Sequence, residues 1–330
     1  MAQMKYFYEL TISSSPHAHS KTTTSTIMRD VLIALAPALI GSVYFFGFRA
    51  LVVVLMSMTA CVFFEWGYRK LLKLDSTAFD LSALVTGALL AFVCPVTIPY
   101  WMLLIGDFFA IIIVKQLFGG IGQNFVNPAL AARAFLFSWP VAMSTWVKVG
   151  FENAAGLMGT ADVVTAATPM ASLHQGSLPV ESLMDMFQGN RGGSLGETSA
   201  LLLLIGFVYL LIRKVVSVRI PLSYIGTVAV LALLFPQGND RLVWMAYQVL
   251  GGGLILGACF MATDYVTSPV TKLGQVIFGI GCGIITIVIR YFGGYNEGVS
   301  FAILVMNCCC VLLDKIGRPR PFGVKKEGKK

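Results

Sequence analysis

Hydrophobic residues run along this chain in ten stretches, and most of the polar stretches between them are short. The ten are 31–48, 50–68, 81–96, 98–114, 129–147, 200–212, 222–235, 242–262, 274–292 and 299–313. A membrane-spanning helix needs about 20 apolar residues to cross roughly 30 Å of hydrocarbon. The pattern therefore predicts an all-α polytopic membrane protein of about ten transmembrane helices. The third, sixth and seventh stretches are shorter than such a helix, which leaves their ends open.

Composition narrows the class of protein further. Hydrophobic residues make up 57% of the chain and charged residues only 12%, with a mean hydropathy of +0.79. These values exclude a soluble globular domain. The net charge of +8 does not indicate nucleic-acid binding, because the basic residues follow the ends of apolar stretches. Membrane lipid is the expected surrounding.

The distribution of basic residues predicts the orientation in the inner (cytoplasmic) membrane. Residues 1–26 are polar and contain no apolar signal-peptide core, so we expect them in the cytoplasm. Ten alternating spans then leave only five of the 24 Lys and Arg outside: Arg49, Lys148, Arg191, Arg241 and Arg290. This asymmetry is what the positive-inside rule requires. Both termini are predicted to be cytoplasmic, and the segment 148–198 extracytoplasmic.

The chain divides into five parts on this basis. They are a cytoplasmic segment (1–26), a first five-helix membrane half (27–147), an extracytoplasmic loop (148–198), a second five-helix half (199–314) and a basic cytoplasmic tail (315–330).

Two halves of five helices would have opposite orientations, and an offset of 170 residues reveals a weak repeat. Residues 87, 88, 96, 97 and 99 are identical to residues 257, 258, 266, 267 and 269. The sequence NPA at 127–129 also falls opposite NEG at 296–298. Chance similarity between apolar segments is the competing explanation. We expect two inverted repeats.

Candidate chemistry lies in the outside loop, where residues 162–168 read DVVTAAT. This string resembles the flavinylation motif Asp-x-x-Ser/Thr-Gly-Ala-Thr, in which the phosphate of FMN is joined to the last threonine as a phosphodiester. Thr168 matches that threonine, while Asp162, Thr165 and Ala167 match the rest of the motif. Ala166 departs from it, because glycine is usual there. Taken alone, the string also suits a threonine that caps a loop.

Further motifs in the same order resemble the D subunits of Rnf electron-transport complexes. They are SSSPH at 13–17 with IMRDV at 27–31, GGIGQNFVNPA at 119–129, MATD at 261–264 with TSP at 267–269, and EGVSFAILVMN at 297–307 with RPRPFG at 318–323. The second and third are similar also to the B subunit of the Na⁺-pumping NADH:quinone oxidoreductase. The short N-terminal segment favours Rnf over that enzyme.

The resemblance implies a subunit of an ion-translocating (Na⁺ or H⁺) ferredoxin:NAD⁺ oxidoreductase. It implies covalent FMN on Thr168, a second, non-covalent flavin of the riboflavin type, and a flavin transferase for maturation. The implied partners are membrane iron–sulfur subunits and a second covalent flavoprotein subunit. Two alternatives stay open, the quinone-reductase subunit and a non-redox inverted-repeat transporter. No catalytic acid or base and no metal ligand is nominated.

Four polar residues outside the loop are further candidates. Asn124 and Asn127 follow a glycine-rich turn, where they serve either as caps or as contacts to a second flavin or an ion. Asp264 precedes a break at residues 267–269, and broken helices bind ligands at membrane depth. Asp107 lies within the fourth span, where a carboxyl is costly; it is either a hydrogen-bonding residue or part of an ion or proton path. Glu65 is expected to pair with Arg69 on its own helix.

Overall fold

The computed structural model describes residues 22–75, 77–147, 168–197, 199–238 and 240–316. Every regular element in these ranges is helical, which confirms the predicted all-α class. The elements are α1 (Thr24–Phe46), α2 (Phe48–Leu71), η1 (Ala78–Asp80), α3 (Ser82–Phe92), α4 (Tyr100–Phe108), η2 (Phe109–Gln116), α5 (Pro128–Leu136), α6 (Pro140–Met143), α7 (Pro169–His174), α8 (Leu183–Gln188), α9 (Ala200–Ile212), α10 (Arg219–Leu234), α11 (Arg241–Leu250), α12 (Leu254–Leu256), η4 (Gly257–Met261), α13 (Lys272–Phe292) and α14 (Val299–Ile316).

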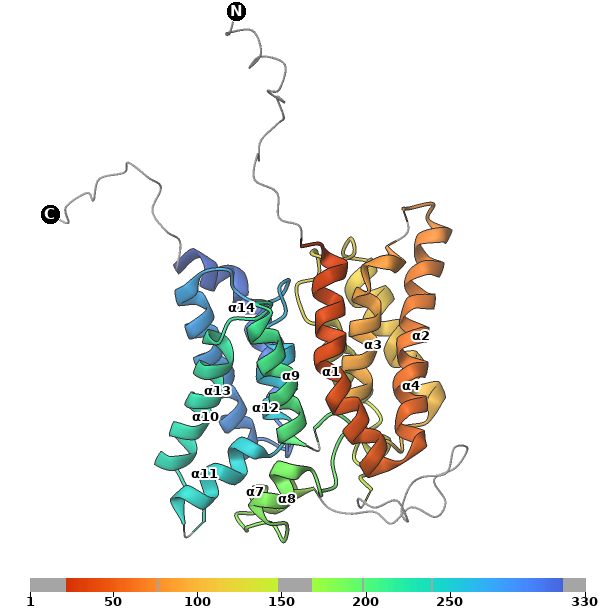
Figure 1. Ribbon diagram of the computed structural model, residues 1–330. Helices are drawn as coiled ribbons and strands as arrows, with labels where there is room; N and C mark the ends of the chain where they lie inside the picture. The colour runs from red at the N-terminus through yellow and green to blue at the C-terminus, as the bar shows by residue number, and fades with distance from the viewer. Residues whose placement is uncertain (1–21, 76, 148–167, 198, 239, 317–330) are drawn as a thin grey trace, which may run out of the picture.

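The helices form two groups that meet along α1 and α9 (Figure 1). One group contains α1 to α4, and the other contains α10, α11, α13 and α14. A second contact between the groups joins α5 to α14. One end of the molecule holds the start of α1 and the end of α14, while α7 and α8 lie at the opposite end.

Several helices have the length and composition of membrane spans. Among the described residues, α1, α2, α13 and α14 qualify individually, and α11 with the helical segment Leu254–Met261 qualifies as a bent pair. Three further apolar helices, α3, α9 and α10, are shorter. The chain is therefore a multi-pass membrane protein.

The fifth predicted span is not one helix, so that prediction was wrong. The helix α5 ends at Leu136, and a separate short α6 begins at Pro140. Proline disfavours the helical conformation in the residue before it, and Trp139 accordingly has φ −111° and ψ 71°. The break brings the C-terminal end of α5 close to the loop that follows α13, through the ring contact between Phe137 and Tyr295.

The eighth predicted span is also broken, with a bend of 60° between α11 and the segment that starts at Leu254. Gly252 and Gly253 adopt φ values of 59° and 65°, a left-handed conformation that costs glycine little. The guanidinium of Arg290 donates hydrogen bonds to the carbonyls of Gln248 and Gly251. A buried arginine thus satisfies carbonyls that the break removes from the helix.

Candidate functional sites

Thr168 lies at the end of the molecule that holds α7 and α8, directly before α7. Its backbone occupies the N-cap position, with Pro169 in the first turn, but its side chain makes no capping hydrogen bond. The residue is 5% exposed and lines a cavity of about 270 Å³. The Thr168 hydroxyl therefore does not cap the loop, which was the alternative that the sequence left open.

Aromatic and charged side chains surround this cavity, which we call the outer pocket. Its aromatic lining consists of Phe137, Trp146 and Tyr295. Glu297 also lines it, and its carboxylate accepts a hydrogen bond of 2.7 Å from Arg133. The outer pocket therefore presents flat apolar faces, a hydroxyl and one paired carboxylate.

Arg133 links Glu297, in the wall of the outer pocket, to buried side chains behind that wall. Its guanidinium also donates to Ser300 at 2.9 Å and lies 3.4 Å from the carboxylate of Glu197. A buried arginine between two carboxylates fixes the position of both. The cluster joins α5, the segment before α9 and the start of α14, so it ties the two helix groups together at this end.

The other motif residues, Asp162, Thr165 and Ala167, lie outside the described residues.

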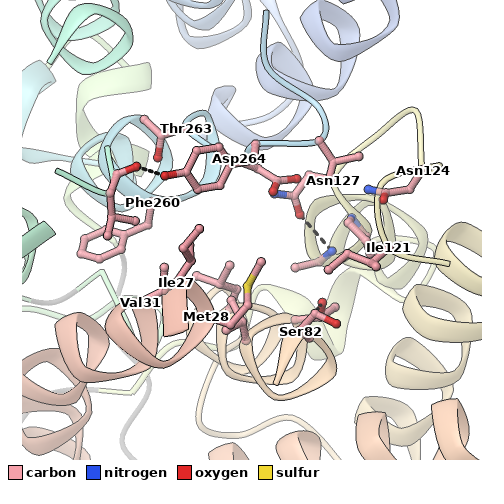
Figure 2. Close-up of a pocket in the computed structure, with 18 of the residues that line it drawn as sticks. Ile27, Met28, Val31, Ser82, Ile121, Asn124, Asn127, Phe260, Thr263 and Asp264 are labelled. Atoms are coloured by element: carbon pink, nitrogen blue, oxygen red, sulfur yellow. Dashed lines mark hydrogen bonds between the residues drawn. The ribbon is translucent and has the colours of Figure 1, made fainter. Parts of the chain in front are cut away.

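A second cavity, which we call the inner pocket, lies between the helix groups (Figure 2). Ile27, Met28 and Val31 of α1 form an apolar side, and Phe260 of η4 closes another. The polar lining consists of Ser82, Thr86, Lys115, Asn124, Asn127, Thr263, Asp264 and Tyr265. The cavity volume is about 90 Å³.

The inner pocket brings together three of the polar residues that the sequence singled out. Asn127 is the N-cap of α5, one of the two roles that the sequence left open, and its side-chain oxygen accepts from the backbone N–H groups of Ala129 and Leu130. Its amide nitrogen donates to the carbonyl of Met261, across the boundary between the two halves. Asn124 donates to the carbonyl of Val126, and Asp264 accepts from Thr267. All three side chains are thus held by their neighbours at the pocket wall.

Lys115 is the functional candidate that sequence reasoning missed in this pocket. Its ammonium lies 2.9 Å from the Glu65 carboxylate and donates to Ser82 at 2.8 Å. The predicted pair of Glu65 with Arg69 is therefore wrong; Glu65 is 1% exposed and bonds to Thr77, Lys115 and Gln116 instead. The sequence does contain a signal for this residue: Lys115 is a charged residue within an apolar stretch, eight residues after Asp107.

Comparison with known proteins identifies the relatives of this chain. The model of the NQR2, RnfD, RnfE family matches residues 11–323. The chain belongs to this family. It is 48% identical to the D subunit of the Na⁺-translocating ferredoxin:NAD⁺ oxidoreductase complex of Acetobacterium woodii, covering 97% of this chain and 98% of the relative. Identity is 42% to the D subunit of the proton-translocating ferredoxin:NAD⁺ oxidoreductase complex of Clostridium ljungdahlii, over 96% and 97%.

A third relative of this NQR2, RnfD, RnfE family member is the D subunit of the ion-translocating oxidoreductase complex of Stutzerimonas stutzeri. It is 38% identical over 94% of this chain and 95% of the relative. The family match spans both pockets, since Thr168, Asn127 and Asp264 all fall within residues 11–323. The resemblance drawn from the sequence motifs is confirmed.

The described part of this family member contains no group of three or more His, Cys, Asp or Glu side chains that could hold a metal ion. Four cysteines, Cys61, Cys94, Cys259 and Cys282, are buried between helices, whereas Cys308 is exposed.

Proposed function

We propose that this chain is the D-type membrane subunit of an ion-translocating ferredoxin:NAD⁺ oxidoreductase (Rnf) complex. The names of three relatives, matched over nearly their whole length, support the subunit and the complex. The subunit acts as an electron carrier and has no independent enzyme activity. Its partners are the membrane iron–sulfur subunits and a second covalent flavoprotein subunit of the same complex.

The electron carrier at the outer pocket is FMN, esterified through its phosphate to Thr168. The observation that carries this assignment is the position of the Thr168 hydroxyl, which is not used as a helix cap and lines the outer pocket. The cavity, about 270 Å³, approaches the roughly 300–1,000 Å³ of ordinary ligand pockets. Phe137, Trp146 and Tyr295 offer faces to a planar ring. The residues present therefore fit the group.

The inner pocket is the proposed site of a non-covalent flavin of the riboflavin type. Its amide, hydroxyl and ammonium groups suit the hydrogen-bonding edge of a flavin ring, and the side chains of α1 and η4 suit its apolar part. Its volume of about 90 Å³ is too small for the whole ring. Binding there requires the walls to move apart, and α1 presents the largest apolar wall.

The two pockets lie at opposite ends of α5. Asn127, Pro128 and Ala129 at its start line the inner pocket, whereas Phe137, directly after its end, lines the outer one. Nine helical residues span roughly 14 Å at 1.5 Å per residue. This short helix supports the proposal because carriers at its two ends would be near neighbours.

The proposed topology has ten spans in two inverted five-helix repeats, with both termini in the cytoplasm. The contacts of α1 with α9 and of α5 with α14 support it, because the first and last helices of the two repeats would meet at the pseudo-two-fold axis. Basic residues also agree: Arg69, Lys70 and Lys315 lie in the last turns of α2 and α14, at the end opposite α7. The outer pocket is then extracytoplasmic.

The test is the intact mass and in-gel flavin fluorescence of the chain produced with a flavin transferase. We expect one FMN adduct on the wild type and none on Thr168→Val. The matched control is Ser177→Ala, which removes an exposed hydroxyl just after α7 that donates to the carbonyl of Ser172, and its adduct should be undiminished. A wild-type chain without an adduct would favour the non-redox transporter instead.

A further inference from the structure

A buried carboxyl, that of Asp107, lies away from both pockets on α4. Asp107 is 0% exposed, and its Oδ1 atom lies 2.5 Å from the hydroxyl oxygen of Ser57 and 3.3 Å from the sulfur of Cys61, both on α2. The Ser57 hydroxyl is also 2.9 Å from the carbonyl oxygen of Gly87 on α3. Gly87 permits this contact, since a Cβ there would lie 2.7 Å from the Ser57 carbonyl oxygen.

The number of hydrogens in this cluster decides the charge of Asp107. Ser57 has one hydroxyl hydrogen, yet its oxygen contacts two acceptors, the Asp107 carboxyl and the Gly87 carbonyl. An ionised Asp107 would leave one of these two short oxygen–oxygen contacts without a hydrogen. A protonated Asp107 donates to Ser57, and Ser57 then donates to Gly87, so that each contact contains one hydrogen.

The second carboxyl oxygen supports the same conclusion independently. Oδ2 of Asp107 has no hydrogen-bond partner among the described residues and is shielded from solvent. An unpaired charge in the membrane interior costs several kcal/mol, and a neutral carboxylic acid avoids most of that cost. The nearby apolar cluster of Cys61, Ala83 and Ile111 provides no compensating charge.

Further polar side chains on α2, α4 and η2 form a line from this region toward the end of the molecule where α2 stops. Ser57, Cys61 and Glu65 recur every four residues on one face of α2, and Asp107 and Lys115 lie eight residues apart on α4 and η2. The nearest ion pair along this line is Glu65 with Lys115, and Gln116 links Glu65 to Arg69. From α5, Leu136 packs near Gly106 beside Asp107.

We propose that Asp107 is a proton-binding site of the membrane domain, which holds its proton through Ser57 and Gly87 and exchanges it along the α2–α4 line. The short Asp107–Ser57 separation has no space for a cation between the two oxygens, and the hydrogen count of the cluster calls for a proton there. Asp107 itself lines neither pocket, so its test does not depend on the flavin assignments, while Lys115, farther along the line, also lines the inner pocket.

Infrared difference spectroscopy of the purified complex at neutral pH tests this site. The wild-type minus Asp107→Asn spectrum is expected to contain the C=O stretch of a protonated carboxylic acid, shifted in D₂O. In Ser57→Ala the same band is expected to remain but move to higher frequency, since the acid loses its acceptor. This second variant keeps the test valid if Asp107→Asn does not assemble.

Asp185→Asn is the matched control. Asp185 lies in the exposed segment around α8, and hydrogen bonds from Ser182 lower its pKa. Its replacement should therefore remove no carboxylic-acid band. A wild-type spectrum without the Asp107 band, or a band unchanged by Ser57→Ala, would overturn the proposal, whatever the flavin content of the variants.

Discussion

The outer and inner pockets differ in how they can retain a ligand. The outer pocket is built from short helices and loops, has aromatic sides and contains a hydroxyl that is not used in capping. The inner pocket is lined by the start of α1, by α3, η2 and η4 and by the segments around Asn124 and Asp264, and Asn127 and Lys115 in its wall are tied into the fold by hydrogen bonds. A covalent bond can thus retain a ligand in the outer pocket, whereas a ligand in the inner pocket depends on hydrogen bonds and packing against walls that must first move apart.

Breaking the ion pair at the inner pocket should have the largest effect on stability. Lys115→Met leaves the buried Glu65 carboxylate without its cation. Removing one partner of a buried pair costs about 3–5 kcal/mol. We expect a large fall in thermal stability of the purified chain in detergent and loss of the extractable flavin. The double variant Glu65→Gln/Lys115→Met should recover much of the stability; equal stabilities of wild type and single variant would contradict the pairing.

Asn127→Ala should have an intermediate effect, again confined to the inner pocket. The variant loses the cap of α5 and the hydrogen bond to the Met261 carbonyl. Loss of an N-cap costs about 0.5–2 kcal/mol. Extractable flavin should fall while covalent flavin stays constant, as measured on the same sample. Asn127→Ser, which keeps a capping oxygen, should recover stability; failure of both variants to alter extractable flavin would count against this pocket.

Glu297→Gln should change the redox potential of the flavin in the outer pocket and leave the inner pocket unaffected. The change removes a carboxylate from the outer wall but keeps a side chain of similar shape beside Arg133. Loss of a negative charge favours the reduced, more anionic flavin, so the midpoint potential of the flavin should rise by tens of millivolts. For one electron, about 59 mV corresponds to a tenfold change in the equilibrium constant of reduction. A redox titration of the covalent flavin measures this. An unchanged or lowered potential would argue against a flavin in this pocket.

The smallest effect is expected from Tyr265→Phe. The Tyr265 hydroxyl donates to the carbonyl of Val215, and both residues line the inner pocket. One hydrogen bond contributes about 1 kcal/mol. The extractable flavin should therefore exchange faster with added riboflavin, with little change in amount. Tyr295→Phe, in the outer pocket, is the matched control and should leave that exchange rate unchanged.

The sequence predicted more of the fold than of the pocket walls. Apolar stretches locate most helices because membrane helices must be apolar along most of their length. The breaks at Pro140 and Gly252 were not anticipated: the first follows from the local effect of Pro140 on Trp139, and at the second a distant residue, Arg290, satisfies the freed carbonyls. Thr168 and Asn127 belong to local motifs and were found. Lys115 and Arg133 were missed, because their partners Glu65, Glu197 and Glu297 lie 50, 64 and 164 residues away.

Acid precipitation of the purified chain would test the assignment of one flavin to each pocket. Covalent flavin stays with the precipitated protein, and non-covalent flavin is released. We expect one flavin in each fraction for the wild type, and only the released flavin for Thr168→Val. Flavin that still precipitates with Thr168→Val would contradict covalent attachment at the outer pocket.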